Sequence, residues 1–359
     1  MTVIFCIRPT KRNIGNDLIS LATSDLLYAQ FGSETLIVDI PALEGDEFGG
    51  LTARQVYDIN RFADGVVIGG GNLFENGQLT VDLQALEALR PPMMIMGLSH
   101  GRIYGRSREL VWRTDSMPAE KIRKLVNKSL VTLVRDRASA LLLEEITRDE
   151  IAVGGCPSMF MPRKPPEHES DQKILVSIRH PGRMSVPADL QWRIAEDLRR
   201  LLVVLKERHP GKVQLVCHDY KDIEFAAGFP DVPCQYYDDV QRYILALRQC
   251  RCSITYRLHA FLPCLAFGTP SIHLSYDERG KQMVATAGMA DWDIDLVSEN
   301  NVVDAVLARM DTLADYHALR SRAQPVIHAM RETTSRALDR FAEALSSARL
   351  TRPTEEAGR

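Results

Sequence analysis

Short, almost continuously apolar runs alternate with helix-length segments along most of this chain. Such runs are typical of parallel strands buried on both faces, and the segments between them are long enough for crossover helices. The pattern therefore predicts an α/β protein with mainly parallel sheets. The predicted strands form a first series, Val3–Ile7, Thr35–Ile40, Gly65–Gly69, Met93–Leu98, Val131–Val134 and Ile151–Val153, and a second series, Ile174–Ile178, Val213–Cys217, Ser253–Tyr256 and Ser271–Leu274.

The segment Pro157–Asp171 separates the two series, and its four prolines and several charges are typical of an interdomain linker. At 359 residues the chain is long enough for two domains. We expect two doubly wound Rossmann-like domains, residues 1–160 and 171–349, and a polar tail over 350–359. The helical pattern from Asp304 to Arg349 is expected to break near Pro325.

Charge and hydropathy argue against several classes of protein. The net charge is −3 and no block of lysine or arginine occurs, which argues against a nucleic-acid partner. No apolar run approaches the roughly 20 residues needed to span a bilayer. The first residues lack the charged start and cleavage site of a signal peptide, so we expect a cytoplasmic protein.

The seven cysteines are scattered and odd in number, which predicts buried free thiols. Cys250 and Cys252 are the closest pair, but they lack the second pair that a zinc site needs. We therefore expect no metal site.

The stretch Cys252–Tyr276 is the most informative for function. It predicts a buried strand, then Arg257 and His259, a short apolar helix and a second strand. In an extended segment side chains two apart share a face, so Arg257 and His259 are expected to point the same way. A guanidinium, an imidazole and a helix N-terminus together suit a small anion. In the alternative interpretation Arg257 caps a carbonyl and His259 is a core residue.

Polar residues also follow most of the other predicted strands. In open parallel sheets ligands bind beyond the carboxyl ends of the strands, so one cleft between the domains would gather these residues. The run Gly69–Asn72 lacks dinucleotide and P-loop spacing, and it forms either a close approach to a ligand or a tight turn. The strand ends carry Arg8 with Asn13–Asp17, Gly69–Asn72, Gly97–Gly101, Arg135-Asp136, Arg179-His180, His218-Asp219 and Tyr276-Asp277.

This ordered set resembles the polysaccharide pyruvyl transferase family over roughly residues 1–290. The matching pieces are N-I-G-N-D at 13–17, G-G-G-N at 69–72, G-L-S-H-G at 97–101, V-R-D-R-A-S at 134–139, S-I-R-H at 177–180, Y-R-L-H-A at 256–260, G-T-P at 268–270 and S-Y-D at 275–277. The resemblance implies transfer of a pyruvyl group from phosphoenolpyruvate to sugar hydroxyls with release of phosphate. It also implies an architecture similar to that of the GT-B glycosyltransferases.

The resemblance implies roles for individual residues as well. Arg257 would grip the carboxylate or phosphate of phosphoenolpyruvate, and His259 would act as general acid or base. Arg179 would be a second anion contact, and no cofactor beyond the donor substrate is implied. Further substrate-binding residues would be His180, Tyr276 and Arg279 in the second domain, with Asn13, Gly15, Asn16, Gly70, Gly71, Asn72, Ser99 and His100 nearer the acceptor in the first.

The chain departs from the family pattern at three positions. Asn16 stands where the family often has Asp, Cys156 replaces an Asp between Gly155 and Pro157, and Glu278-Arg279 replaces a Lys. These changes concern the acceptor and the exact reaction more than the fold. The alternatives are a GT-B glycosyltransferase using a nucleotide sugar and a binding protein on the same fold that has lost catalysis. The sequence leaves open which sugar or glycoconjugate is the acceptor, whether the product is a ketal or an enol ether, any peripheral membrane contact, and whether the subunits form a homo-oligomer.

Overall fold

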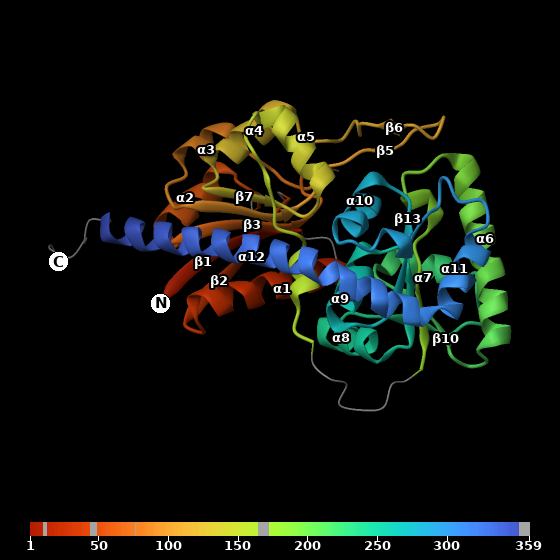
Figure 1. Ribbon diagram of the computed structural model, residues 1–359. Coiled ribbons are helices and arrows are strands. Elements are labelled where there is room, and N and C mark those ends of the chain that lie inside the picture. Colours follow the sequence, from red (N-terminus) through yellow and green to blue (C-terminus); the bar gives the residue numbers. More distant parts are fainter. Residues whose placement is uncertain (10–12, 44–48, 76, 164–171, 352–359) are drawn as a thin grey trace.

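The computed structural model describes residues 1–9, 13–43, 49–75, 77–163 and 172–351, and it contains two six-stranded sheets (Figure 1). Every strand pair described within these two sheets is parallel. The predicted α/β class is thereby confirmed. The strand orders are β2-β1-β3-β4-β7-β8 in the first sheet and β11-β10-β9-β12-β13-β14 in the second.

Helices cover both faces of the first sheet. Its strands alternate between two apolar clusters, with Phe5 and Ile7 facing α2–α5 and Ile4 and Cys6 facing α1 and α12. This alternation is expected for a sheet buried on both sides. The strands are β1 (Thr2–Arg8), β2 (Thr35–Pro41), β3 (Gly65–Gly71), β4 (Met93–Leu98), β7 (Val131–Val134) and β8 (Ala152–Val153), and the helices are α1 (Ile14–Phe31), α2 (Ala53–Phe62), α3 (Leu83–Ala88), α4 (Ala119–Lys128) and α5 (Arg137–Thr147).

The second sheet has the same construction. Ile174 and Val176 of β9 pack in the cluster that contains α6, whereas Leu175 packs in the cluster that contains α8 and α9. Its strands are β9 (Ile174–Ser177), β10 (Val213–Cys217), β11 (Cys234–Tyr236), β12 (Cys252–Thr255), β13 (Ser271–Ser275) and β14 (Asp293–Asp295). Its helices are α6 (Ala188–Arg208), α7 (Tyr220–Ala226), α8 (Val240–Gln249), α9 (Leu258–Phe267), α10 (Glu278–Thr286) and α11 (Val302–Asp311).

The last helix, α12 (Leu313–Thr351), runs alongside both sheets (Figure 1). The predicted break at Pro325 is wrong, because the helix continues through this proline and the interruption lies at Thr312, between α11 and α12. A proline within a helix removes one backbone hydrogen bond, and packing along a long helix can offset that loss. The end of α12 returns to the first sheet, where Leu338 and Phe341 pack with Ile4. The C-terminal part of the expected second domain therefore contacts both sheets.

Part of the predicted interdomain linker Pro157–Asp171 belongs to the folded core. Its first residues form a 3₁₀ helix, η1 (Pro157–Phe160), that is buried with the core of the second sheet. Residues 164–171 of the predicted linker and 352–359 of the predicted tail lie outside the described residues. Among the described helices, none combines the length and the apolar character needed to cross a bilayer.

A short antiparallel hairpin, β5 (Ile103–Tyr104) and β6 (Leu110–Val111), extends from the first sheet toward the second (Figure 1). The sequence pattern did not predict it, nor the edge strands β11 and β14. All of these strands have two or three residues, too few for a recognisable apolar run.

Candidate functional site

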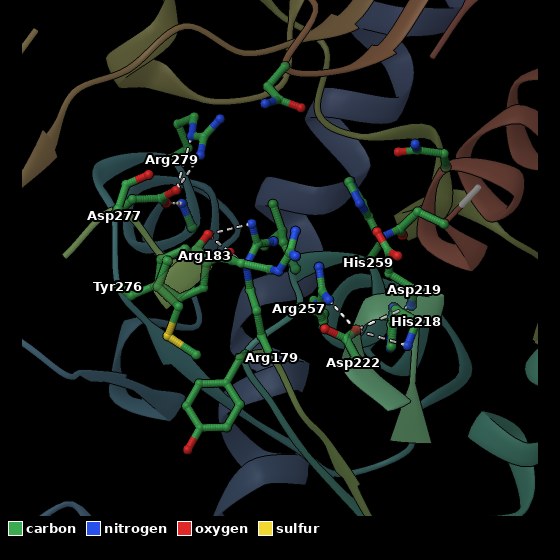
Figure 2. Close-up of a pocket in the computed structure, with 18 of the residues that line it drawn as sticks. Arg179, Arg183, His218, Asp219, Asp222, Arg257, His259, Tyr276, Asp277 and Arg279 are labelled. Atoms are coloured by element: carbon green, nitrogen blue, oxygen red, sulfur yellow. Dashed lines mark hydrogen bonds and ion pairs between the residues drawn. The ribbon is translucent and has the colours of Figure 1, made fainter. Parts of the chain in front are cut away.

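A cavity of about 310 Å³ lies where the carboxyl ends of the two sheets face each other (Figure 2). Its walls come from the turns that follow β1, β3, β7, β9, β10, β12 and β13, as the strand-end argument predicts. The residues that line it are Asn13, Asn16, Asn72, Gln78, Arg113, Arg135, Arg179, Arg183, Met184, Ser185, His218, Asp219, Lys221, Asp222, Tyr256, Arg257, Leu258, His259, His273, Tyr276, Asp277, Arg279 and Gly280.

The cavity is strongly cationic although the chain carries a net charge of −3. Seven arginine and lysine side chains line it, against three aspartates. A concave site with this excess of one sign concentrates ions of the opposite sign. The cavity therefore suits a ligand that carries more than one negative charge.

Arg257 is fixed by a buried ion pair. It is the N-cap residue of α9, and its guanidinium donates to the Asp222 carboxylate (Figure 2). The side chains are 10% and 1% exposed, respectively, so solvent screens the pair little. The backbone N–H of Arg257 also donates to the Thr255 hydroxyl at 2.8 Å. These contacts hold the guanidinium at the cavity wall.

Asp222 owes its position to the start of α7. Asp219 is the N-cap of this helix and Asp222 is its third residue, and the two form a capping box. The Asp222 carboxylate accepts from the backbone N–H groups of His218 and Asp219 at 3.3 and 3.2 Å. One carboxylate thus connects the end of β10 to Arg257 on the neighbouring wall.

His259 stands in the first turn of α9, two residues after Arg257. Its Nε2 is buried, and no hydrogen-bond partner for it occurs within the described ranges. Burial, with Arg135, Arg257 and Arg279 nearby, lowers its pKa to about 3, so the imidazole is neutral near pH 7. A side chain on Gly15 would come within 3.0 Å of the Cβ of His259, so this glycine lets α1 approach the imidazole.

Arg179 lies beside Arg257 and is held differently (Figure 2). Its Nε and Nη2 donate to the carbonyl of Arg183 at 3.1 and 2.7 Å, and its guanidinium lies 5.5 Å from the centre of the Tyr276 ring. Burial lowers the pKa of Arg179 below its usual value. In the part of the chain that the structure describes, no carboxylate is within ion-pair distance of Arg179, Arg183 or Lys221. These three cations supply the unbalanced positive charge of the cavity.

Arg279 joins the two halves of the cavity. It forms ion pairs with Glu75, which follows β3, and with Asp277, the N-cap of α10. Beside it Arg102 forms a two-armed ion pair with Glu278, at 2.6 and 3.0 Å. Because Glu75 is fully buried and Glu278 is 4% exposed, these pairs tie the first sheet to the second.

Two further histidines of the cavity lining are held by hydrogen bonds. His218 Nε2 contacts the hydroxyls of Ser177 and Tyr243 at 3.2 and 2.9 Å, and burial lowers its pKa well below the usual value. His273 Nδ1 contacts Asp293 at 2.7 Å. Both rings are therefore oriented by their neighbours.

Four amide side chains line the cavity from the first sheet and its connecting segments, which also contribute Arg113 and Arg135. Asn13 caps α1, and its Oδ1 accepts from the N–H of Gly15 at 2.9 Å. Asn16, Asn72 and Gln78 also line the cavity. Amides donate and accept hydrogen bonds, which suits hydroxyl groups.

The structure brings together eight of the predicted site residues: Arg257, His259, Arg179, Tyr276, Arg279, Asn13, Asn16 and Asn72. His180 lies on the surface, where its Nδ1 accepts from the N–H of Gly182 and its ring packs against Phe225. Successive residues of an extended chain point to opposite sides, so His180 diverges from Arg179.

The remaining predicted residues support the lining without forming part of it. Gly70 has a positive φ of 84°, and a side chain there would clash with Ile19 of α1. The Ser99 hydroxyl donates to the carbonyl of Gly71 at 3.4 Å. His100 is buried, with its ring between those of Phe74 and Trp112.

Several residues that line the cavity were not predicted from the sequence. Arg113 follows the unpredicted hairpin and pairs with Asp115 at 2.8 Å. Arg183 ends the short 3₁₀ helix η2 (Pro181–Arg183) and Lys221 is the second residue of α7, and neither belongs to a sequence motif. Asp222 could have been predicted from the sequence, because an acidic residue three positions after a capping Asp219 is typical of a capping box at a helix N-terminus. Cys156 is buried beside Ser158 and is absent from the lining.

Two Rossmann-like sheets that face a shared cavity define the GT-B fold. The UDP-GlcNAc 2-epimerase from Neisseria meningitidis superimposes with a TM-score of 0.57 at 12% identity, covering 94% of this chain and 100% of that one. The UDP-GlcNAc 2-epimerase from Methanocaldococcus jannaschii gives a TM-score of 0.53 at 11% identity, covering 86% and 92%. At these identities the likeness shows the fold alone.

Residues 13–278 match the sequence profile of the polysaccharide pyruvyl transferase family, and the chain belongs to this family. The resemblance inferred from the ordered motifs is confirmed. No curated protein sequence gives a significant match.

Proposed function

We propose that this protein transfers a pyruvyl group from phosphoenolpyruvate to hydroxyls of a sugar or glycoconjugate and releases phosphate. Membership of the family supports a transferase of this kind. The observation that carries the proposal is the buried Nε2 of His259, which has no hydrogen-bond partner among the described residues and lies with Arg257 in a cavity that has an excess of cations. Transfer of a pyruvyl group from phosphoenolpyruvate requires a site that binds the anionic donor and a nearby side chain that can move a proton.

The donor would bind against the second sheet. Phosphoenolpyruvate carries a carboxylate and a phosphate, and planar guanidinium groups bind both in a two-armed manner. Arg257 and Arg179 lie next to each other for this role, and Arg183 and Lys221 add charge. Asp222 holds Arg257 in place but also neutralises it. The positive charge for the donor would therefore come mainly from Arg179, Arg183 and Lys221, which form no ion pair with a carboxylate among the described residues.

The chemistry is an addition followed by an elimination. The methylene carbon C3 of the donor gains a proton, while an acceptor hydroxyl oxygen forms a bond to C2 and loses its own proton. The bond between C2 and the phosphate oxygen then breaks, and phosphate leaves with the electron pair. A second hydroxyl of the acceptor closes a cyclic ketal, or loss of a proton from C3 gives an enol ether.

His259 would move a proton in this sequence. With a pKa of about 3 it is neutral before the donor binds, so Nε2 can take the proton of the attacking hydroxyl. The negative charge of a bound donor raises the pKa of a neighbouring imidazole. His259 is thus better able to hold that proton when the donor is present.

The acceptor would approach from the first sheet. Asn13, Asn16, Asn72 and Gln78 can hydrogen-bond to sugar hydroxyls there. In this arrangement the acceptor would bind on the side of the first sheet and the donor against Arg179 and Arg257 of the second.

The test is incubation with phosphoenolpyruvate and a panel of sugars and glycoconjugates. We expect acceptor-dependent phosphate release and a product heavier by the mass of phosphoenolpyruvate minus phosphoric acid. A ketal and an enol ether have the same mass, and the vinyl protons of the enol ether distinguish them by NMR. His259→Ala and Arg257→Ala should abolish the reaction, whereas the matched control His180→Ala should keep it, because that histidine lies outside the cavity.

Three outcomes would contradict the proposal. Full activity in both cavity variants would remove the residue assignment. Thermal stabilisation by nucleotide sugars but not by phosphoenolpyruvate would favour a GT-B glycosyltransferase. If the protein binds neither phosphoenolpyruvate nor a nucleotide sugar, a non-catalytic binding protein on the same fold would be favoured.

A further inference from the structure

Two thiols are in contact at the edge of the second sheet. Cys217 ends β10 and Cys234 begins β11, and their sulfur atoms lie 3.3 Å apart. The strands run parallel with Leu215 opposite Cys234, so Cys217 is two residues beyond that pair. Residues two apart on a strand share a face, which places both thiols on the same side of the sheet. The sulfurs need to approach by about 1.3 Å to reach disulfide length, and because Cys217 lies two residues along β10 from the partner of Cys234, the backbone has to move as well.

The two thiols differ in accessibility. Cys234 is exposed because β11 is the edge strand, whereas the other six cysteines are buried. Hydrogen bonding from the Cys217 thiol lowers the pKa of Cys234. A small reagent in solution therefore meets Cys234 first, with Cys217 directly behind it.

We propose that Cys217 and Cys234 form a dithiol site that exchanges with low-molecular-weight disulfides and so modifies the anion cavity. The Cys234 thiolate attacks one sulfur of the small disulfide, forms a mixed disulfide and releases one thiol. Cys217 then loses its proton and attacks the Cys234 sulfur, which releases the second thiol. In total the protein dithiol is oxidised to one disulfide and the small disulfide is reduced to two thiols.

The cavity is coupled to this site through the chain itself. Cys217 is followed by His218 and Asp219, whose N–H groups donate to Asp222 at 3.3 and 3.2 Å. Asp222 in turn holds Arg257. A shift of Cys217 toward Cys234 therefore displaces the start of α7 and, with it, the guanidinium proposed to bind the donor.

The experiment treats the full chain with glutathione disulfide, blocks the remaining thiols and maps the peptides by mass spectrometry. We expect a link between Cys217 and Cys234, with the five other cysteines still thiols. The buried Cys250 and Cys264 are an internal control. Cys234→Ser should not cross-link. A lasting glutathione adduct on Cys234 without the link, or a link at another pair, would overturn the site.

The coupling is measured on the same samples. This expectation rests on the proposed function: oxidation should weaken phosphoenolpyruvate binding by roughly fivefold or more. Dithiothreitol should restore the binding, and neither treatment should change the binding in Cys234→Ser. Hydrogen exchange over residues 218–222 should rise in the cross-linked protein. Unchanged exchange and unchanged binding after cross-linking would overturn the coupling. If even the reduced protein fails to bind phosphoenolpyruvate, the proposed function fails, while peptide mapping and hydrogen exchange still decide this inference.

Discussion

Replacing Arg257 by methionine should cost stability and donor binding for two different reasons, which a second substitution can separate. The Asp222 carboxylate is 1% exposed and would lose its cation, and breaking a buried pair in this way costs about 3–5 kcal/mol. Loss of charge-assisted hydrogen bonds to the donor, at about 1.5–3 kcal/mol, weakens binding roughly 10- to 150-fold.

The separating variant is Arg257→Met combined with Asp222→Asn. An amide oxygen at position 222 can still accept from the N–H groups of His218 and Asp219, and the unpaired buried charge is removed. Replacing both partners of a buried pair is often close to neutral, so we expect the double variant to unfold within about 1–2 kcal/mol of the native protein. Its affinity for phosphoenolpyruvate should remain as low as that of Arg257→Met.

Urea unfolding followed by circular dichroism gives the stabilities, and calorimetric titration with phosphoenolpyruvate gives the affinities. Two results would refute the reasoning. If the double variant regains native affinity, Arg257 is not a ligand of the donor, and its single substitution acted through the fold. If Arg257→Met alone leaves the free energy of unfolding unchanged, the pair with Asp222 does not carry the electrostatic cost assigned to it.

Three further predictions address the remaining charges. Burial lowers the pKa of His100 to about 4 and that of His259 to about 3, whereas both titrate near 6.5 when unfolded. Below pH 6.5 the unfolded chain therefore binds more protons than the folded chain. The free energy of unfolding should fall toward pH 4 by up to about 1.4 kcal/mol per pH unit for each histidine. Urea unfolding of His259→Gln at several pH values should show a shallower pH dependence than the native protein, and an unchanged slope would contradict this. Arg279→Gln should lower the free energy of unfolding by about 3–5 kcal/mol, because it leaves the fully buried Glu75 without its cation. Adding Glu75→Gln to the same chain should recover much of that loss. If thermal unfolding shows the double variant to be less stable than Arg279→Gln, the pair does not act as described. Arg179→Lys should weaken phosphoenolpyruvate binding about tenfold, because an ammonium lacks the planar fork, with stability within about 0.5 kcal/mol; equal affinity by calorimetry would exclude a two-armed contact.

The central strands could be predicted because a parallel strand covered on both faces must be apolar throughout. Gly65–Gly71 is buried along its whole length and reads as one run. Edge strands have no such constraint, so β11 and β14, each three residues long, gave no signal. The continuity of α12 through Pro325 could not be predicted either, because it depends on the two sheets along which the helix packs.

The site was predictable where it depends on local chain order. Arg257 and His259 reach one cavity, yet not as alternating residues of a strand, since β12 ends at Thr255 and His259 already belongs to α9. A helix N-terminus that faces the cavity presents both side chains. By contrast, the pairing of Arg257 with Asp222 joins elements 35 residues apart and is decided by how the second sheet is wound.

The division of the cations into two groups explains how the cavity can be both ordered and attractive to anions. Arg113, Arg135, Arg257 and Arg279 each form an ion pair with a carboxylate, so their geometry is fixed but they contribute little net charge. Arg179, Arg183 and Lys221 have no carboxylate within ion-pair distance among the described residues. They repel one another while the cavity is empty, and an anion that enters relieves that repulsion. A ligand that binds only the folded chain also stabilises it by mass action. Donor binding and fold stability are therefore linked through this second group, whereas the first group keeps its positions whether or not the donor is present.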